Sequence, residues 1–337
     1  MLNILRNHSL LKHNTFRIKA SAKFFAVPET LGELITILRK YRKPDQDLLT
    51  IGEGSNILLT NDFQGLIIRP DIKGVEILDK SPDNAIIKVW AGENWDNFVV
   101  FCITNGFGGI ENLSWIPGSV GACPIQNIGA YGAEVKNVIE SVTGILTDSL
   151  EQITFTRNNC NFGYRDSIFK QELKGRFIIT NVIFKLSRNP VFNTSYGRLQ
   201  EELSGNNKID LQSVRQAVIK IRKDKLPDPD KFGSAGSFFK NPVISKDKLN
   251  NLRSDYPDIP NYPVNIQEVK VAAGWLIEKA GWAGKRTGNT GVYSKQALIL
   301  LNYGSATGKQ IMELAEKIMI SVNKKFGINL QTEINII

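Results

Sequence analysis

The sequence predicts an α+β protein built from two or three domains. Helical and strand-like patterns both occur along the chain, and 337 residues are enough for more than one hydrophobic core. The hydrophobic content of 42% is ordinary for a globular protein. No apolar run approaches the ~20 residues that a membrane helix requires. We therefore expect a protein that works in the cytoplasm, without a membrane partner.

Hydrophobic periodicity places the secondary-structure elements in order. Apolar residues recur at helical spacing over residues 31–38, 96–104, 210–221, 271–279 and 309–326. Alternating or β-branched and aromatic stretches predict strands over residues 48–51, 57–59, 142–147, 176–185, 297–301 and 329–337. Residues 226–233 contain two prolines and a glycine and form the clearest linker.

The most informative segment covers residues 116–132, which contain four glycines, two prolines and no charged side chain. Because glycine lacks a Cβ and proline fixes φ, backbone N–H groups in such a segment can turn outward and contact a ligand. A second short loop, residues 52–56, lies between two of the predicted strands. A buried connection between strands is the plain alternative for either loop taken alone.

Neither loop matches a Rossmann or P-loop phosphate site, because such a site needs a helix directly after the glycines. Strand-like residues follow the loop at residues 52–56 instead. A further glycine pair, Gly304 and Gly308, is one residue too close for a P-loop, and Thr307 with Gln310 has capping-box spacing at the start of a helix. Two loops that each join strand to strand would suit a diphosphate held by scattered backbone amides.

Histidine and cysteine usage excludes several kinds of site. Both histidines, His8 and His13, lie near the N-terminus, so a histidine-based catalytic triad or histidine-rich metal site elsewhere is impossible. The cysteines Cys102, Cys123 and Cys160 are widely spaced and form no Cys-x-x-Cys pair. We expect buried, reduced thiols and no metal site.

The net charge of +9 follows from 42 basic and 33 acidic residues. It leaves open a nucleic-acid binder and a protein whose ligands carry several phosphates. Five basic residues precede the first acidic residue, Glu29, which could suggest a targeting peptide. The apolar stretches there are too short for a signal-peptide core, so we expect this segment to belong to the folded protein.

A series of motifs covers nearly the whole chain. They are Asn-Thr-Phe at 14–16, Gly-Glu-Gly-Ser-Asn at 52–56, the segment 116–132, Phe-Gly-Tyr-Arg-Asp-Ser at 162–167, Lys-Leu-Pro-Asp-Pro at 225–229, Ala-Gly-Ser-Phe-Phe-Lys-Asn-Pro at 235–242, and Glu333. In this order and spacing they resemble the UDP-N-acetylenolpyruvoylglucosamine reductases (UDP-N-acetylmuramate dehydrogenases), flavin enzymes of bacterial peptidoglycan synthesis. Residues 195–199 resemble the lid loop of the branch in which a tyrosine covers the nucleotide diphosphate.

The resemblance implies a particular α+β architecture. It combines a two-lobed FAD-binding fold of the vanillyl-alcohol-oxidase/PCMH type with a C-terminal α+β substrate domain. On this chain the first lobe would cover residues 1–70 and be joined by a returning strand at 327–337. The second lobe would cover residues 71–226, and the substrate domain residues 227–326.

The resemblance also implies the ligands and the residues that bind them. FAD would be bound non-covalently, NADPH would be the co-substrate, and UDP-N-acetylglucosamine enolpyruvate would be the substrate. The matching FAD-binding positions are Gly52, Glu53, Gly54, Ser55, Asn56, Ile116, Pro117, Gly118, Gly121, Ala122, Ile125, Asn127, Gly129, Ala130 and Gly132. The positions that match UDP-sugar contacts are Tyr196, Lys225, Asn241 and Gln296.

The catalytic candidates follow from the chemistry of the implied reaction. Reducing an enolpyruvyl ether adds hydride to its β-carbon and a proton to its α-carbon, and negative charge develops beside a carboxylate. The resemblance implies that Arg165 clamps the carboxylate, which a permanently charged, planar guanidinium suits. It implies that Glu333 polarises the enolic acid and that Ser237 delivers the proton. Taken alone, these three would be a surface arginine, an edge-strand glutamate and a turn residue.

The chain departs from the family pattern at three positions. Arg17, Ala283 and Asn335 stand where glycine, lysine and arginine are usual. None of the three is a catalytic candidate. The departures affect the contacts expected with the substrate phosphates.

Two rival functions stay open. An oxygen-using sugar or alcohol oxidase could share a related flavin fold, but many such enzymes attach FAD through histidine, and none lies near either glycine loop. A nucleic-acid binder would fit the net charge, but the basic residues lack the interleaved aromatic pattern of stacking platforms. We expect a monomer that binds no nucleic acid.

Overall fold

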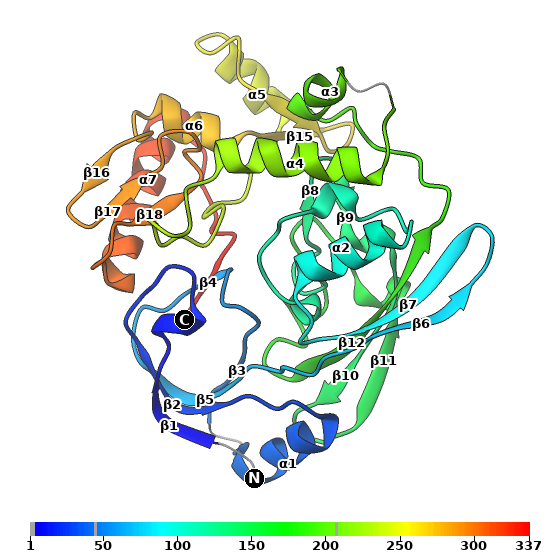
Figure 1. The fold of residues 1–337 in the computed structure, drawn as a ribbon. Coiled ribbons are helices and arrows are strands. Elements are labelled where there is room, and N and C mark those ends of the chain that lie inside the picture. The colour runs from blue at the N-terminus through cyan, green and yellow to red at the C-terminus, as the bar shows by residue number, and fades with distance from the viewer. Residues whose placement is uncertain (1–3, 44–45, 206–207) are drawn as a thin grey trace. The chain divides into compact units, whose positions relative to one another are not determined.

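The computed structural model describes residues 4–43, 46–205 and 208–337, and Figure 1 shows the course of the chain. The chain divides into two compact units. The first unit comprises the residues up to 8 together with 22–53 and 63–224, and the second comprises 9–21, 54–62 and 225–337. The loop at residues 52–56 therefore carries the chain out of the first unit and into the second.

A small sheet in the first unit is covered by a helix. Its strand order is β1 (Ile4–Ser9), β2 (Ser21–Ala26), β5 (Phe63–Ile68) and β3 (Leu48–Thr50), and β5 runs parallel to both of its neighbours. Helix α1 (Leu31–Tyr41) begins where the hydroxyl of Thr30 accepts the amide N–H of Glu33 at 3.1 Å. The buried face of α1, Leu34, Ile37 and Leu38, packs in one core with side chains of the sheet.

A larger antiparallel sheet forms the rest of the core of the first unit. Its order is β11 (Gln152–Thr156), β10 (Ile139–Leu146), β12 (Phe177–Ser187), β7 (Asn84–Trp90) and β6 (Val75–Lys80). Helix α2 (Trp95–Thr104) lies against this sheet in Figure 1, and its residues Trp95 and Phe98 pack near Phe184 of β12. The expected helix stop at Gly106 is confirmed, since this glycine has φ 75°.

Short elements and two helices complete the first unit. The 3₁₀ turns are η2 (Glu111–Leu113), η3 (Val120–Ala122), η4 (Val135–Asn137) and η5 (Arg157–Cys160), and β8 (Gly129–Ala130) pairs with β9 (Ala133–Glu134). Helices α3 (Arg198–Leu203) and α4 (Leu211–Lys225) share a small core of their own. The expected cap of α4 is confirmed, because Asp210 Oδ1 accepts the amide N–H of Ser213 at 2.8 Å.

The second unit carries several small sheets beside three helices. One sheet has the order β13 (Val243–Ser245), β15 (Glu268–Val271) and β14 (Asn261–Pro263). A second sheet has the order β16 (Arg286–Thr287), β17 (Thr290–Val292) and β18 (Leu300–Asn302). Strand β19 (Asn335–Ile336) pairs in parallel with β4 (Ile57–Leu58). The remaining elements are η1 (Leu11–His13), α5 (Lys246–Arg253), α6 (Ala273–Lys279) and α7 (Gly308–Phe326). The capping box of Thr307 and Gln310 at the start of α7 is confirmed.

Two expectations about strands are wrong in part. The last segment forms a strand only over Asn335–Ile336, because the pairing with β4 is two residues long. Residues 116–132 do not join strand to strand, since 3₁₀ turn η2 precedes them and η3 lies within them. In both segments most backbone groups do not pair with a neighbouring strand. Hydrophobic periodicity does not show which groups pair in this way.

The three cysteines are buried and free, as expected. Burial raises the pKa of the Cys160 thiol to about 12, and it raises the pKa of Cys102 and Cys123 as well. All three thiols are therefore protonated at neutral pH and act as small apolar side chains. None of the helices in the described part of the chain is both long and apolar enough to span a bilayer.

Candidate functional site

Glu53 joins the two glycine-rich loops. One carboxylate oxygen of Glu53 accepts the amide N–H of Gly118 at 2.9 Å, and the other accepts the side-chain amide of Asn94 at 2.6 Å. Asn94 is itself fixed, because its oxygen caps α2 by accepting the N–H of Asn97 at 3.0 Å. The first loop is thereby held against the second by a charge-assisted contact that starts from a rigid helix end.

A pocket opens where these two loops meet within the first unit. The loops contribute Gly52, Ser119, Gly121, Ala122 and Ile125, and the surrounding strands contribute Thr50, Ile51, Pro70, Ala91, Phe177 and Ile179. Four of the residues expected to bind FAD thus line one cavity. Its walls are mostly apolar and small, as in sites for flat, ring-containing ligands.

Glycine is required at two positions of this pocket by close packing. A Cβ on Gly52 would lie 2.5 Å from Ser119 Oγ, and a Cβ on Gly121 would lie 2.6 Å from Ala91 Cβ. The amide N–H of Gly121 donates to the carbonyl of Ala91 at 2.9 Å, and that of Gly118 is used by Glu53. Gly118 and Gly121 of the second loop therefore do not present free amides, contrary to our expectation for that loop.

The first loop does present amides. Among the described residues, none accepts a hydrogen bond from the backbone N–H of Gly52, Glu53 or Gly54. Gly54 has φ 67°, a conformation that favours glycine. Successive amides with no protein acceptor form a concave site for an anion such as a diphosphate.

Arg165 is tied to the later part of the second loop. Its guanidinium donates to the carbonyl of Gly129 at 2.6 Å and to the carbonyl of Asn127 at 3.4 Å. The residue has φ 54°, in the left-handed region, and lies in a tight turn in which the N–H of Gly163 donates to the carbonyl of Asp166 at 3.0 Å. Arg165 is half-buried, so its charge is fixed in position but still reachable.

Asn127 holds the shape of the second loop. Its side chain is fully buried, its amide nitrogen donates to the carbonyl of Gly163 at 2.9 Å, and its oxygen accepts the N–H of Lys136 at 3.1 Å. This amide thus adds to the hydrogen bonds of Arg165 that connect the loop and the turn. Of the other expected cofactor residues, Ala130 lies in β8, Gly132 follows it, and Ile116 and Pro117 lead into Gly118.

Ser237 and Glu333 are brought together in the second unit. The amide N–H of Glu333 donates to the carbonyl of Phe238, the residue after Ser237, at 2.8 Å. The N–H of Lys240 donates to the carbonyl of Gln331 at 2.9 Å, which continues the pairing of the two segments. Both Ser237 and Glu333 are half-buried. Arg165 belongs to the first unit.

Two expected substrate residues meet at the start of α6. Asn241 Oδ1 accepts the amide N–H of Ala273 at 2.9 Å, and a Cβ on Gly274 would lie 3.0 Å from Gln296 Oε1. Of the other two, Lys225 is the last residue of α4, and Tyr196 is 48% exposed just before α3. Ser55 and Asn56 lie in the second unit, where the carbonyl of Asn56 accepts the N–H of Asn335 at 3.0 Å.

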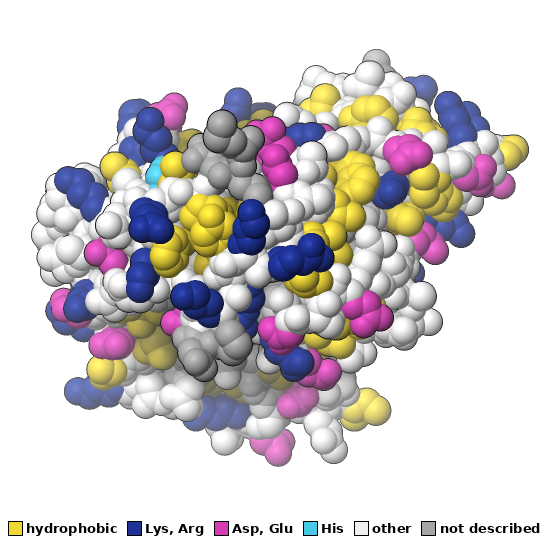
Figure 2. Space-filling view, turned by 90° about the horizontal axis from the view of Figure 1, so that it is seen from below, with side chains coloured by type: hydrophobic (Ala, Val, Ile, Leu, Met, Phe, Trp, Pro, Cys, Tyr) yellow, Lys and Arg dark blue, Asp and Glu magenta, His cyan; other side chains and the backbone are white. Residues whose placement is uncertain are grey.

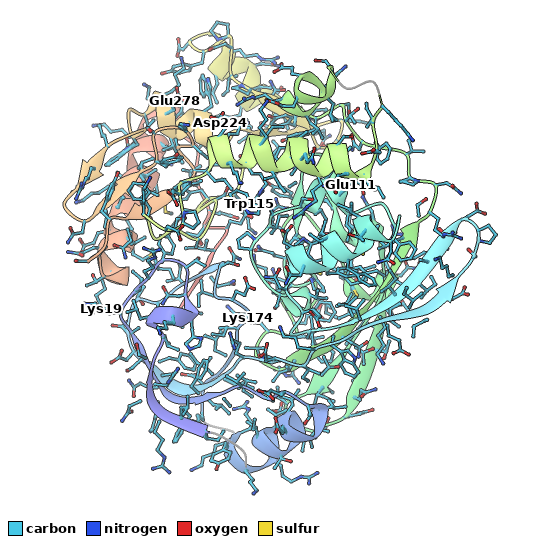
Figure 3. The ribbon with its side chains drawn as sticks, viewed as in Figure 1. Lys19, Glu111, Trp115, Lys174, Asp224 and Glu278 are labelled. Atoms are coloured by element: carbon cyan, nitrogen blue, oxygen red, sulfur yellow. The ribbon has the colours of Figure 1, made fainter. Side chains whose placement is uncertain are left out.

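An ion pair that was not predicted from the sequence holds Trp115, the residue directly before the second loop. Arg215 of α4 makes two hydrogen bonds of 2.6 and 2.8 Å to the carboxylate of Asp96 at the start of α2. Asp96 also accepts the N–H of Trp115 at 2.5 Å, and Arg222 donates to the carbonyl of Trp115 at 3.2 Å. Figure 3 shows Trp115 below α4. Its φ of 59° is uncommon for a tryptophan, and these two hydrogen bonds hold it there.

This network predicts a pH-dependent contribution to stability. Burial alone would raise the pKa of Asp96, but hydrogen bonds from Arg215 and Trp115 outweigh it and lower that pKa below 3.8. The stabilisation is therefore complete above the unfolded-state pKa of about 4 and is lost as the pH falls through the lower folded-state value. We expect Asp96→Asn to cost about 2 kcal/mol at pH 7, because it weakens the charge-assisted hydrogen bonds of a mostly buried Arg215.

Urea unfolding from pH 7 to pH 3 measures this contribution. The difference between wild type and Asp96→Asn should shrink as the pH falls. Asp255→Asn, a change at an exposed carboxylate in the second unit, serves as the control and should leave the free energy of unfolding nearly unchanged. A constant difference between wild type and Asp96→Asn across the pH range would contradict the assignment.

Comparison with known proteins decides the family. Residues 22–150 match a family model described as an FAD binding domain, and residues 228–337 match one described as the C-terminal domain of UDP-N-acetylenolpyruvoylglucosamine reductase. The chain is 47% identical over 339 residues to the reductase of that name from Flavobacterium johnsoniae, with 100% of both chains covered. It is 43% identical to the one from Amoebophilus asiaticus, again over 100% of both. The chain belongs to the UDP-N-acetylenolpyruvoylglucosamine reductase family.

The fold agrees with this membership. The crystal structure of UDP-N-acetylenolpyruvylglucosamine reductase from Thermus caldophilus superimposes with a TM-score of 0.69 at 21% identity, covering 100% of this chain and 98% of that chain. As a UDP-N-acetylenolpyruvoylglucosamine reductase family member with an FAD-binding domain, the protein is an FAD-dependent oxidoreductase. The α+β fold with an FAD-binding domain of the PCMH type is confirmed.

Three residues that organise the site were not singled out from the sequence. Asp96, Asn112 and Arg222 each bond to segments far away along the chain. Asn112 carried a weak signal, since it stands beside Glu111 in an otherwise apolar stretch, and both side chains are buried. A buried polar pair is unusual enough to suggest a structural role.

Proposed function

We propose that this protein reduces UDP-N-acetylglucosamine enolpyruvate to UDP-N-acetylmuramate with electrons from NADPH, as a step of peptidoglycan precursor synthesis. The observation that carries the proposal is the end-to-end similarity, at 47% identity, to a protein named for the reduction of this class of substrate. The geometry supports it, because the two glycine-rich loops form one pocket and the segments of Ser237 and Glu333 are paired.

The pocket of the first unit fits FAD without a covalent bond. The two loops can pack this closely only because Gly52 and Gly121 lack a Cβ, and the amides of residues 52–54 suit a diphosphate. Both histidines lie at positions 8 and 13, outside the pocket lining, so no histidyl attachment is proposed. Of the positions assigned to FAD, those in residues 52–56 would bind the diphosphate, and Gly121, Ala122 and Ile125 would line the ring system.

Held by the residues of the pocket, FAD would supply the hydride chemistry that carries electrons from NADPH to the β-carbon of the substrate. Arg165 binds the substrate carboxylate through its guanidinium, which its hydrogen bonds to Gly129 and Asn127 aim and hold. Glu333 polarises the enolic acid, and the Ser237 hydroxyl gives its proton to the α-carbon. The product is the saturated lactyl ether, so one hydride and one proton balance the reaction.

Tyr196, Lys225, Asn241 and Gln296 would bind the UDP-sugar. Lys225 supplies a positive charge for a phosphate, and Asn241 and Gln296 lie together at the start of α6. The exposed ring of Tyr196 would cover the diphosphate, and we propose that this chain belongs to the branch of the family with a tyrosine lid. We propose the FAD lobes at residues 1–70 with 327–337 and at 71–226, and the substrate domain at 227–326.

We propose a cytoplasmic monomer that binds no nucleic acid or membrane. On the face drawn in Figure 2, Lys and Arg side chains are interspersed with acidic and hydrophobic ones. A nucleic-acid site would need basic groups gathered in one stripe or patch. Phosphate-bearing ligands such as NADPH, FAD and a UDP-sugar account for a basic protein equally well.

An anaerobic experiment tests the proposal. The purified protein should be yellow, and after photoreduction its flavin absorbance should return when UDP-N-acetylglucosamine enolpyruvate is added. Rapid oxygen consumption with a sugar alcohol would favour an oxidase instead. A flavin that stays reduced after addition of the enolpyruvyl substrate would overturn the proposed function.

A further inference from the structure

Asn112 connects two segments that are far apart in sequence. Its side chain is 2% exposed and lies in the 3₁₀ turn η2. One amide nitrogen carries both bonds: it donates to the carbonyl of Tyr131 at 2.8 Å and to the carbonyl of Asn193 at 2.8 Å. Both N–H groups of this buried amide are therefore used, one on the second glycine-rich loop and one on residues 193–197, which we name the lid segment.

The lid segment makes a return contact to the same loop. Asn193 donates its side-chain amide to the carbonyl of Gly132 at 3.1 Å, and Ser195 Oγ donates to Asn193 Oδ1 at 3.2 Å. Gly132 has φ 78°, and a Cβ there would lie 2.7 Å from Asn193 Nδ2. The absence of a side chain at Gly132 is thus what allows Asn193 to reach the loop.

Two aromatic rings form a further contact between the lid segment and the second glycine-rich loop. The ring of Tyr196 in the lid segment meets the ring of Tyr131 edge-on, with centroids 6.2 Å apart. Arg222 of α4 lies close enough to Tyr131 to act on its hydroxyl electrostatically, and its Nε donates to the carbonyl of Trp115 at 3.2 Å. The position of Tyr196 therefore depends on the second glycine-rich loop as well as on its own segment.

We propose that Asn112 and Asn193 are positioning residues that latch the lid segment onto the second glycine-rich loop and so place Tyr196. The same loop lines the pocket upstream at Gly121 and Ala122, so a ligand that orders this loop also orders the lid segment. The role of the latch in catalysis rests on the proposed function, in which Tyr196 covers the nucleotide diphosphate. The latch itself is a property of the first unit and can be measured without substrate.

Limited proteolysis tests the latch directly. Asn193→Ala removes two hydrogen bonds of an exposed side chain, the one donated to Gly132 and the one accepted from Ser195, so the fold should survive. In the FAD-bound protein, chymotrypsin should cleave after Tyr196 about fivefold faster in Asn193→Ala than in wild type, the factor expected from a loss of about 1 kcal/mol at this exposed side chain. Asn189→Ala is the matched control, because Asn189 lies in the same exposed stretch but bonds Asp83 instead.

Steady-state kinetics gives a second measurement, which would not change if Asn193 had only a structural role. Asn193→Ala should raise the KM for the enolpyruvyl substrate about fivefold, with kcat and the KM for NADPH unchanged. Equal cleavage rates in Asn193→Ala and Asn189→Ala would overturn the latch. Faster cleavage with no turnover of the enolpyruvyl substrate by wild type would keep the latch and overturn the proposed function, so the two failures can be told apart.

Discussion

Ser237→Ala should slow reoxidation of the photoreduced protein by the enolpyruvyl substrate by roughly 10²–10⁴-fold, the range that a positioned proton donor contributes. Reduction by NADPH should continue at nearly the wild-type rate, because no proton from Ser237 is needed in that half-reaction. The hydroxyl is held by backbone pairing on both sides of its segment, with the N–H of Phe238 donating to the carbonyl of Leu298 at 2.8 Å. Alanine should leave that pairing intact.

The control for this prediction lies in the same turn. Ser234 is also half-buried, and its backbone N–H donates to the carbonyl of Thr15 at 3.0 Å, so Ser234→Ala keeps the local structure and removes only a hydroxyl. Stopped-flow absorbance of the two half-reactions separates the expected outcomes. Equal loss in both half-reactions, or equal loss in both variants, would assign Ser237 a structural role.

Local signals in the sequence were enough to predict the longer helices and the general place of the site, but strands such as β1, β2, β5, β6 and β7 were not predicted. Helix α4 begins after Asp210 and helix α7 after Thr307, as their capping residues predict. The two glycine-rich segments form one pocket because each contains the small residues that a close approach requires. These features depend on residues within a few positions of one another, which a single sequence records.

Contacts between distant segments could not be predicted from the chain alone. The bond from Asn112 to Asn193 spans 81 residues, and the ion pair of Arg215 with Asp96 spans 119. Nothing in the local pattern of an asparagine or arginine states which distant carbonyl or carboxylate it will meet. For the same reason the second loop was expected to offer free amides, although Glu53 and Ala91 accept those of Gly118 and Gly121.

This last difference leads to a prediction about how FAD is bound. If Gly121 is needed for close packing, then its substitution should weaken FAD binding because the added side chain is too large for the space, and not because a hydrogen bond is lost. Gly121→Val would place a branched side chain 2.6 Å from Ala91 Cβ at the wall of the pocket. Overpacking of this kind costs about 3 kcal/mol. If the protein relieves the clash by moving the wall into the pocket, FAD binding has to reverse that shift, and the Kd for FAD should rise roughly 100-fold. The purified variant should be colourless.

A matched glycine separates loss of the cofactor from loss of the fold. Gly32 lies in α1, where a Cβ meets only Thr30 Oγ1 at 4.0 Å, so Gly32→Ala should keep its flavin and be slightly more stable. Excess FAD should raise the Tm of wild type and of Gly32→Ala, because a ligand stabilises the state that binds it, and should leave the Tm of Gly121→Val nearly unchanged. If Gly121→Val retains its flavin with the wild-type Tm shift, the pocket between the two loops does not bind FAD.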